Sequence, residues 1–180
     1  MKAIYFTQFK GQLSVVDIPV PVPTDDGVVI KVEATGLCRS DWHAWMGHDS
    51  DIVLPHVPGH EFAGVISEIG NAVTKFKVGD RVTVPFVCGC GKCTCCLRGD
   101  AQVCPTQTQP GFTGFGSFAE YVAIDNADFN LINIPSEVSF ATAAALGCRF
   151  ATAYRGLIKR AKLQAGEKVV IYGCGGVGLS

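Results

Sequence analysis

The stretch AGVISEIGNAVTKFKVGDRVTV, residues 63–84, contains the pattern from which the fold of this chain can be inferred. Two short apolar segments, residues 63–66 and 81–84, lie on either side of the turn-forming residues 77–80, KVGD. Apolar runs of this length that are bounded by Gly, Asp or Pro are typical of β-strands. We therefore expect two strands in this stretch.

Similar apolar segments occur on both sides of it, at residues 3–6, 28–32, 118–122 and 131–134. Many short strands that are separated by turns are typical of a β-barrel or a β-sandwich. The sequence up to about residue 135 therefore predicts a mainly β domain.

The pattern changes after Pro135. Ser136, followed three residues later by Ser139, resembles a capped helix start that leads into an apolar stretch ending at Leu146. Residues 150–161 continue with apolar side chains at helical spacing. Residues 168–172, KVVIY, then read as a short buried strand.

The composition excludes several classes of protein. The 180 residues are 48% hydrophobic and 17% charged, and 15 Lys and Arg against 16 Asp and Glu give a net charge of −1. Such a balance is not that of a nucleic-acid binder or an acidic-membrane binder. Apolar runs end well before the roughly 20 residues that a bilayer requires, and the N-terminus has no secretion-signal pattern. We expect a cytoplasmic protein that binds neither nucleic acid nor membrane.

The chain contains nine cysteines, an odd number that favours metal binding or catalysis over a disulfide framework in a reducing compartment. Cys90, Cys93, Cys96 and Cys104 have the spacing C-x2-C-x2-C-x7-C. Four thiolates in one compact loop are what a structural zinc site requires. The metal should organise this loop, since in small zinc peptides it contributes on the order of 10 kcal/mol.

Alternatives remain for this segment. Cys88 and Cys95 are also within reach of the same ion, so the spacing alone does not fix the four ligands. Free thiols in a small core are a second reading. A nucleic-acid zinc ribbon is a third, disfavoured because Lys92 and Arg98 are the only basic residues in the loop.

A dispersed set of residues suggests a second metal site. Residues 38–43 read CRSDWH, residues 59–61 read GHE, and residues 147–148 read GC. A catalytic zinc site commonly takes three ligands from distant segments and keeps a fourth position for water or substrate. From spacing alone this is a hypothesis, because single Cys and His residues are often packing or surface residues.

Residues 173–178 read GCGGVG and follow directly after the expected strand. This fits G-x-G-x-x-G, in which glycines let backbone N–H groups approach a pyrophosphate. A plain glycine turn is the alternative.

Five motifs, in this order, resemble those of the zinc-containing medium-chain alcohol dehydrogenases. They are residues 38–43, residues 59–61, the four-cysteine segment, residues 147–154 and the glycine loop. The resemblance implies a fold that is mainly β with helices. Residues 1–147 would form a GroES-like β-barrel catalytic domain with a structural zinc lobe. Residues 148–180 would form a connecting helix and the truncated start of a Rossmann dinucleotide-binding domain.

The resemblance also implies roles around the catalytic metal. Cys38, His60 and Cys148 match the catalytic zinc ligands, and Glu61 matches an occasional exchange ligand. Asp41 matches a carboxylate that orients the ligating histidine, although a helix N-cap is the simpler reading.

Further roles concern the proton and the cofactor. Ser40 matches the hydroxyl that accepts the alcohol's proton and His43 the imidazole that relays it, where surface residues are the alternative. Arg39 matches a pyrophosphate contact and Thr152 a nicotinamide contact. The phosphate loop would comprise Gly173, Gly175, Gly176, Val177 and Gly178.

The implied activity is the reversible oxidation of a small alcohol to an aldehyde or ketone with NAD or NADP, supported by two zinc ions per chain. Trp45 and Phe86 fall where the family shapes its substrate pocket and would make it narrow, although aromatic core packing is equally compatible. A non-catalytic zinc-binding GroES-like module is the alternative function.

Members of this family are longer, form homo-oligomers, and continue into a complete Rossmann domain. We therefore expect that this chain alone neither binds NAD(P) appreciably nor turns over. We also expect it to self-associate through exposed strand edges.

Overall fold

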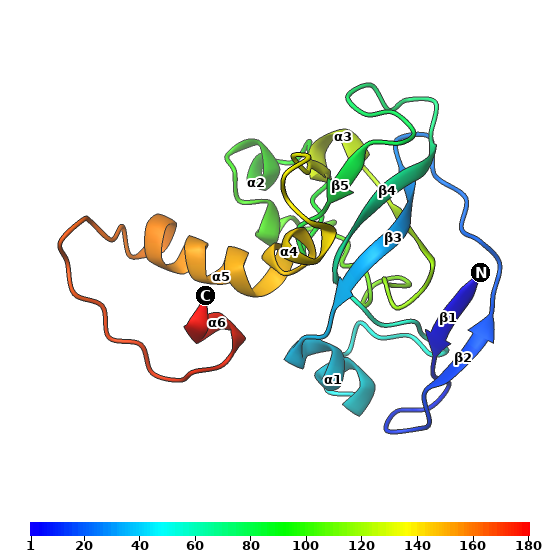
Figure 1. Cartoon of the computed structure of the whole chain (residues 1–180), viewed down its shortest axis with the longest axis horizontal. Coiled ribbons are helices and arrows are strands. Elements are labelled where there is room, and N and C mark those ends of the chain that lie inside the picture. Colours follow the sequence, from blue (N-terminus) through cyan, green and yellow to red (C-terminus); the bar gives the residue numbers. More distant parts are fainter.

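The computed structural model describes all 180 residues of the chain. Its centre is a five-stranded antiparallel sheet with the strand order β6-β3-β4-β5-β7, and β1 and β2 form a separate hairpin (Figure 1). The strands are β1 (Lys2–Tyr5), β2 (Ser14–Asp17), β3 (Val28–Gly36), β4 (Glu61–Ile69), β5 (Arg81–Thr83), β6 (Tyr121–Ile124) and β7 (Ile132–Asn133).

Helices connect and cover these strands. They are α1 (Arg39–Met46), α2 (Thr94–Leu97), the 3-10 helix η1 (Ala101–Val103), α3 (Ala127–Asn130), α4 (Phe140–Ala144), the π-helix η2 (Leu146–Phe150), α5 (Ala151–Tyr154), the π-helix η3 (Arg155–Arg160) and α6 (Gly176–Leu179). None of them is long and apolar enough to cross a membrane.

The nine-residue strands β3 and β4 pair along most of their length. Their register shifts between Val29 and Ile30 and again between Val32 and Ala34. Such irregularities bend a strand and increase its twist, so the sheet curves around an apolar interior. The buried residues of this core are Val28, Ile30, Phe62, Ile66, Val82, Val84, Cys88, Val122, Ile124, Ala127 and Leu131.

Two smaller apolar clusters fix the helices that carry the site. Ala44 of α1 packs with Phe6, Ile52 and Phe112. Ala143 and Ala144 of α4 pack on the sheet with Ala63 and Ile134, and this holds α4 against β3 and β4. Both helices are therefore anchored at the sheet end where β3 finishes and β4 begins.

The expected mainly β fold with helices is confirmed. A strand overlaps each apolar segment predicted before residue 135, whereas β2 was not predicted. The hydrogen-bonded ladder is open, because it ends at β6 on one side and at β7 on the other. The helix predicted near Ser136 begins later: its N-cap is Ser139, whose hydroxyl accepts a hydrogen bond from the Thr142 N–H at 3.1 Å.

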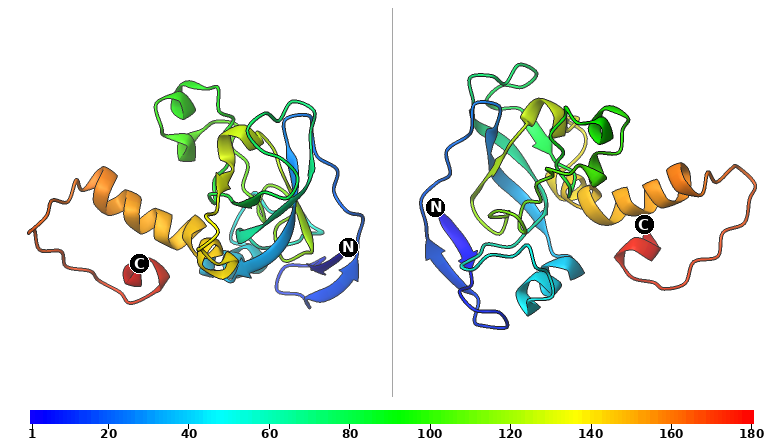
Figure 2. Two further views of the ribbon diagram at one scale, coloured as in Figure 1. Left: turned by 45° about the horizontal axis from the view of Figure 1, so that its top comes forward. Right: turned by 180° about the vertical axis from the view of Figure 1, so that it is seen from behind.

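The predicted strand at residues 168–172 is wrong. No segment pairs with it, and Val170, Ile171 and Tyr172 are 76, 57 and 95% exposed. A strand exists only where a neighbour satisfies its backbone groups, and this segment instead runs free of the sheet. The helices from η2 to η3 and the segment after them project from the sheet on the side away from the β1–β2 hairpin (Figure 2).

Candidate metal and active site

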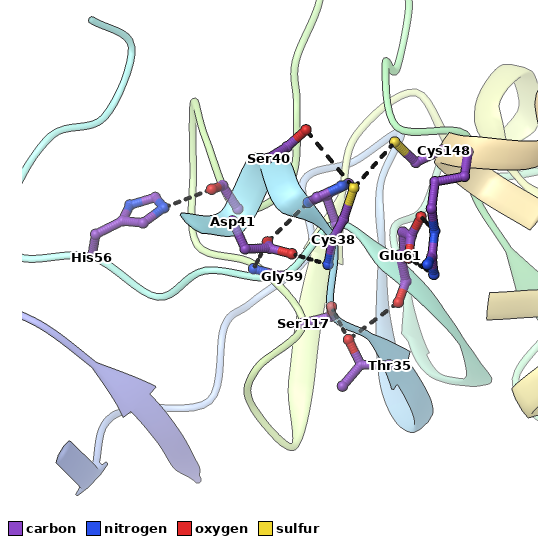
Figure 3. Close-up of polar contacts among 12 residues, drawn as sticks. Thr35, Cys38, Ser40, Asp41, His56, Gly59, Glu61, Ser117 and Cys148 are labelled. Carbon is purple, nitrogen blue, oxygen red and sulfur yellow. Dashed lines mark hydrogen bonds and ion pairs between the residues drawn. The ribbon is translucent and has the colours of Figure 1, made fainter. Parts of the chain in front are cut away.

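Four side chains from distant parts of the sequence meet at one end of the sheet. The ligand atoms of Cys38, His60, Glu61 and Cys148 all lie within 4.8 Å of one another. The antiparallel pairing of Gly36 with Glu61 brings the end of β3 beside the start of β4. Cys38 follows β3 as the N-cap of α1, and Cys148 lies in η2 beside it (Figure 3).

His60 shows that these residues fit a metal ion. Its side chain is fully buried, its Nδ1 is 2.9 Å from Oδ1 of Asp41, and its Nε2 has no hydrogen-bond partner. A buried nitrogen without a partner is costly unless a ligand meets it. The Sγ atoms of Cys38 and Cys148 are 4.0 Å apart, close to the value of about 3.8 Å for two thiolates on one tetrahedral zinc ion.

The protonation of this cluster reflects its buried, anionic character. Burial alone would lower the pKa of His60, yet Asp41 and the thiols of Cys148 and Cys38 raise it to about 10. Burial alone would raise the pKa of Cys38, but a hydrogen bond from the Ser40 backbone N–H and the nearby imidazole of His60 lower it. Burial raises the pKa of Cys148. The cluster therefore attracts positive charge, which a proton or a metal ion can supply.

Asp41 organises three segments at once. Its carboxylate accepts hydrogen bonds from the backbone N–H of Cys38 at 2.8 Å, from that of Gly59 at 3.2 Å and from Nδ1 of His60. The side chain is almost completely buried. Gly59 has a φ of +105°, and a Cβ there would lie 2.7 Å from the backbone N of Phe118. Only glycine allows the chain to enter His60 in this way.

Glu61 is fully buried and is held by a residue that the sequence reading missed. Arg149 donates from Nε at 2.9 Å and from an Nη atom at 2.6 Å to the two carboxylate oxygens of Glu61. Gly36 leaves room for this carboxylate, since a Cβ there would lie 2.6 Å from Oε2 of Glu61. A buried carboxylate requires a counter-charge, and the Arg directly after Cys148 was the signal that could have revealed it.

The residues assigned to proton transfer lie on the outer side of the cluster. The hydroxyl of half-buried Ser40 is 3.9 Å from Sγ of Cys38. His43 is exposed, and its Nδ1 is 3.0 Å from Nδ1 of His48, a contact that the sequence did not predict. The guanidinium of Arg39 lies over a neighbouring aromatic ring, that of Trp42, at 4.1 Å.

The two pocket aromatics line different cavities. Trp45 borders a cavity of about 430 Å³ that also contacts Cys38, and its Nε1 donates to the carbonyl of Gly11 at 2.9 Å. Phe86 packs against the His60 ring at 4.7 Å and borders another cavity, of about 490 Å³, beside Cys148. Both side chains nevertheless pack against one apolar cluster, that of Phe6, Ala44, Ile52 and Phe112.

The residues assigned to the cofactor are only partly brought together. Thr152 is exposed and lines the same cavity as Cys148. The loop of Gly173, Gly175, Gly176, Val177 and Gly178 leads into the four-residue helix α6 and has no strand before it. It approaches the side chain of Arg149, the partner of Glu61, because a Cβ on Gly176 would collide with it.

The four-cysteine lobe is compact and separate from the sheet. The Sγ atoms of Cys90, Cys93, Cys96 and Cys104 lie within 4.8 Å of one another, whereas Cys88 and Cys95 are not in the group. Backbone N–H groups of Lys92 and Cys93 lower the pKa of Cys90 to about 6, and burial raises that of Cys96 to about 12.

The two thiols outside the lobe's group have other contacts. Burial raises the pKa of Cys88 to about 12, and its Sγ is 3.7 Å from the Pro85 carbonyl. The guanidinium of Arg98 is 3.8 Å from Sγ of Cys95. Asp100 of the lobe also pairs with Arg155 of η3 at 2.5 Å, which ties the lobe to the helical stretch that contains Cys148.

Comparisons with known proteins agree with this architecture. Residues 24–136 match the family described as the alcohol dehydrogenase GroES-like domain. An alcohol dehydrogenase of Geobacillus stearothermophilus is 40% identical over 99% of this chain and 52% of its own length.

Solved structures give the same result. The alcohol dehydrogenase TADH from Thermus sp. ATN1 superposes with a TM-score of 0.92 at 31% identity, covering 99% of this chain and 53% of that protein. A cobalt- and zinc-bound thermostable alcohol dehydrogenase from Pyrobaculum aerophilum has a TM-score of 0.89 at 32% identity, covering 99% and 54%. The chain thus spans about half the length of the relatives it matches.

Proposed function

The chain belongs to the alcohol dehydrogenase GroES-like domain family, and from this premise we propose that it is the metal-binding part of a zinc-dependent NAD(P) alcohol dehydrogenase. The reaction is the reversible oxidation of a small alcohol to an aldehyde or ketone. One observation carries the proposal above all. The unpartnered buried Nε2 of His60 lies in the same cluster as the thiols of Cys38 and Cys148.

Cys38, His60 and Cys148 would hold a catalytic zinc ion, and Cys90, Cys93, Cys96 and Cys104 a structural one. When bound at the first site, zinc supplies Lewis acidity toward the substrate oxygen. Asp41 accepts a hydrogen bond from the Nδ1–H of His60, so that Nε2 keeps its lone pair for the metal. This hydrogen bond also orients the imidazole.

The alcohol's proton leaves on the outer side of the cluster. The Ser40 hydroxyl lies beside Cys38 and can accept it. His43 is exposed and in contact with His48, so it can pass a proton to solvent. Arg39, Thr152 and the glycine loop at residues 173–178 would bind the cofactor once they are brought together.

The domain division follows from the same proposal: residues 1–147 form the metal-binding domain, and residues 148–180 connect it to the nucleotide-binding domain. Residues 168–172 are unpaired here, so the glycine loop is not fixed at a sheet edge. For that reason the chain by itself would bind NAD(P) weakly and would not turn over. The exposed apolar side chains of Val170 and Ile171 favour self-association.

Metal analysis tests the proposal directly. The purified chain should contain two zinc ions, and His60→Ala should remove one of them while leaving the lobe loaded. Cys104→Ser should remove the other. A single zinc ion confined to the lobe would contradict the catalytic site and support a non-catalytic zinc-binding module. In a longer protein that contains this chain, His60→Ala should abolish alcohol oxidation.

A further inference from the structure

Glu61 is an unusual neighbour for a metal site that must keep one position free for substrate. Its carboxylate is fully buried and belongs to the same group of ligand atoms as Cys38, His60 and Cys148. A carboxylate is itself a good zinc ligand. With the two thiolates and the imidazole it would complete four protein ligands and close the site.

The hydrogen bonds of Glu61 show what prevents this. Its two carboxylate oxygens accept from Nε of Arg149 at 2.9 Å and from an Nη atom at 2.6 Å, and they have no other partner in the chain. A bidentate hydrogen-bonded contact with a guanidinium neutralises a carboxylate and also fixes its orientation. Without it, a buried carboxylate would carry an uncompensated charge and would turn to the metal.

The position of Arg149 suits this task. It follows Cys148 directly in η2, so its backbone is fixed by the same helix that presents a metal ligand. Its side chain is about one third exposed, whereas that of Glu61 is fully buried. Arg149 therefore contacts the Glu61 carboxylate from the solvent side.

We propose that Arg149 is a positioning residue that holds the Glu61 carboxylate away from the catalytic metal and thereby keeps the fourth coordination position open. This inference rests on the proposed function. Removing the guanidinium should convert an open site with three protein ligands into a closed one with four.

Cobalt spectroscopy tests the inference without relying on turnover. The chain is loaded with Co²⁺ and titrated with imidazole, which binds only where a coordination position is open, so the closed four-cysteine lobe does not respond. In the unmodified chain imidazole should shift the visible bands. Arg149→Met should weaken apparent imidazole binding by about tenfold or more and slow Co²⁺ removal by a chelator by a similar factor. Adding Glu61→Gln to Arg149→Met should restore imidazole binding.

Arg155→Met provides a matched control. Arg155 is similarly exposed and also pairs with a carboxylate, that of Asp100, but this pair lies at the four-cysteine lobe. Its removal should leave the imidazole response unchanged. If Arg149→Met does not fold, Arg149→Lys is used instead, in which one ammonium group replaces the bidentate guanidinium contact. The loss of imidazole binding should then be smaller than in Arg149→Met. It should again disappear when Glu61→Gln is added.

The outcomes separate the two proposals. If the Arg149 variants bind imidazole like the unmodified chain, or if Glu61→Gln does not restore binding, the role of Arg149 is overturned while the metal site stands. If the unmodified chain takes up Co²⁺ only in the lobe, the proposed catalytic site is overturned, and the role of Arg149 with it.

Discussion

Replacing Asp41 by Asn should weaken both the fold and the metal site. The carboxylate accepts hydrogen bonds from Cys38, Gly59 and His60 while it is almost completely buried. An Asn side chain of the same shape has one acceptor oxygen. If that oxygen keeps the bonds from Gly59 and His60, its amide N–H faces the Cys38 N–H, and two buried donors oppose each other.

The magnitude follows from these contacts. The bond from Cys38 at 2.8 Å is lost, and a hydrogen bond to a charged group contributes about 1.5–3 kcal/mol. The two remaining bonds become weaker because they are no longer charge-assisted. We expect a loss of about 3 kcal/mol in the free energy of unfolding, measured by urea denaturation of the zinc-loaded chain.

The metal should also be held less tightly. Because Asp41 orients the His60 imidazole, Asp41→Asn should reduce zinc affinity at the catalytic cluster by 10- to 100-fold, measured by chelator competition. Asp128→Asn is the control, since Asp128 also accepts hydrogen bonds, from Thr74 and Lys75, but lies in helix α3, outside the group of ligand atoms. It should leave zinc affinity unchanged. The reasoning is refuted if Asp41→Asn and Asp128→Asn have the same effect on zinc binding.

Three further predictions concern metal release, the lobe and the space around Glu61. In the metal-free chain the pKa of His60 is about 10 and that of Cys90 about 6, so zinc must displace a proton from His60 at neutral pH but not from Cys90. In the lobe the pKa of Cys96 is about 12, so zinc must displace a proton there as well. Metal affinity therefore falls at both sites as the pH is lowered, and a chromogenic chelator should detect increasing zinc release on acidification. Cys104→Ser should release the lobe zinc and make residues 90–104 sensitive to proteolysis, whereas Cys95→Ser should do neither, because Cys95 lies outside the group of ligand atoms. Gly36→Ala should lower the free energy of unfolding by about 1–3 kcal/mol, measured by thermal unfolding, because the added Cβ would displace Glu61. Gly114 has open space around it, so Gly114→Ala should change this free energy by less than about 0.5 kcal/mol. Equal effects of the two substitutions would contradict the packing described at Glu61.

The local features of this protein can be predicted from its amino-acid sequence. Apolar runs bounded by turn residues, such as 63–66 and 81–84, located the strands because strand formation depends on local alternation and on turns. The regular cysteine spacing indicated a metal lobe for the same reason, since its four candidate ligands lie within 15 residues of chain, 90–104. Residues 168–172 have the same local pattern and yet form no strand, because a strand also requires a paired neighbour.

The contacts between distant residues depend on how the chain folds. Arg149 was overlooked because nothing local relates it to Glu61, which lies 88 residues earlier in the chain. The pairing of β3 with β4 and the packing of α4 on the sheet bring these two charges into contact. The same pairing leaves Nε2 of His60 buried without a partner. Burial and long-range contact are properties of the folded chain, and they turn scattered Cys, His, Glu and Arg residues into one candidate site.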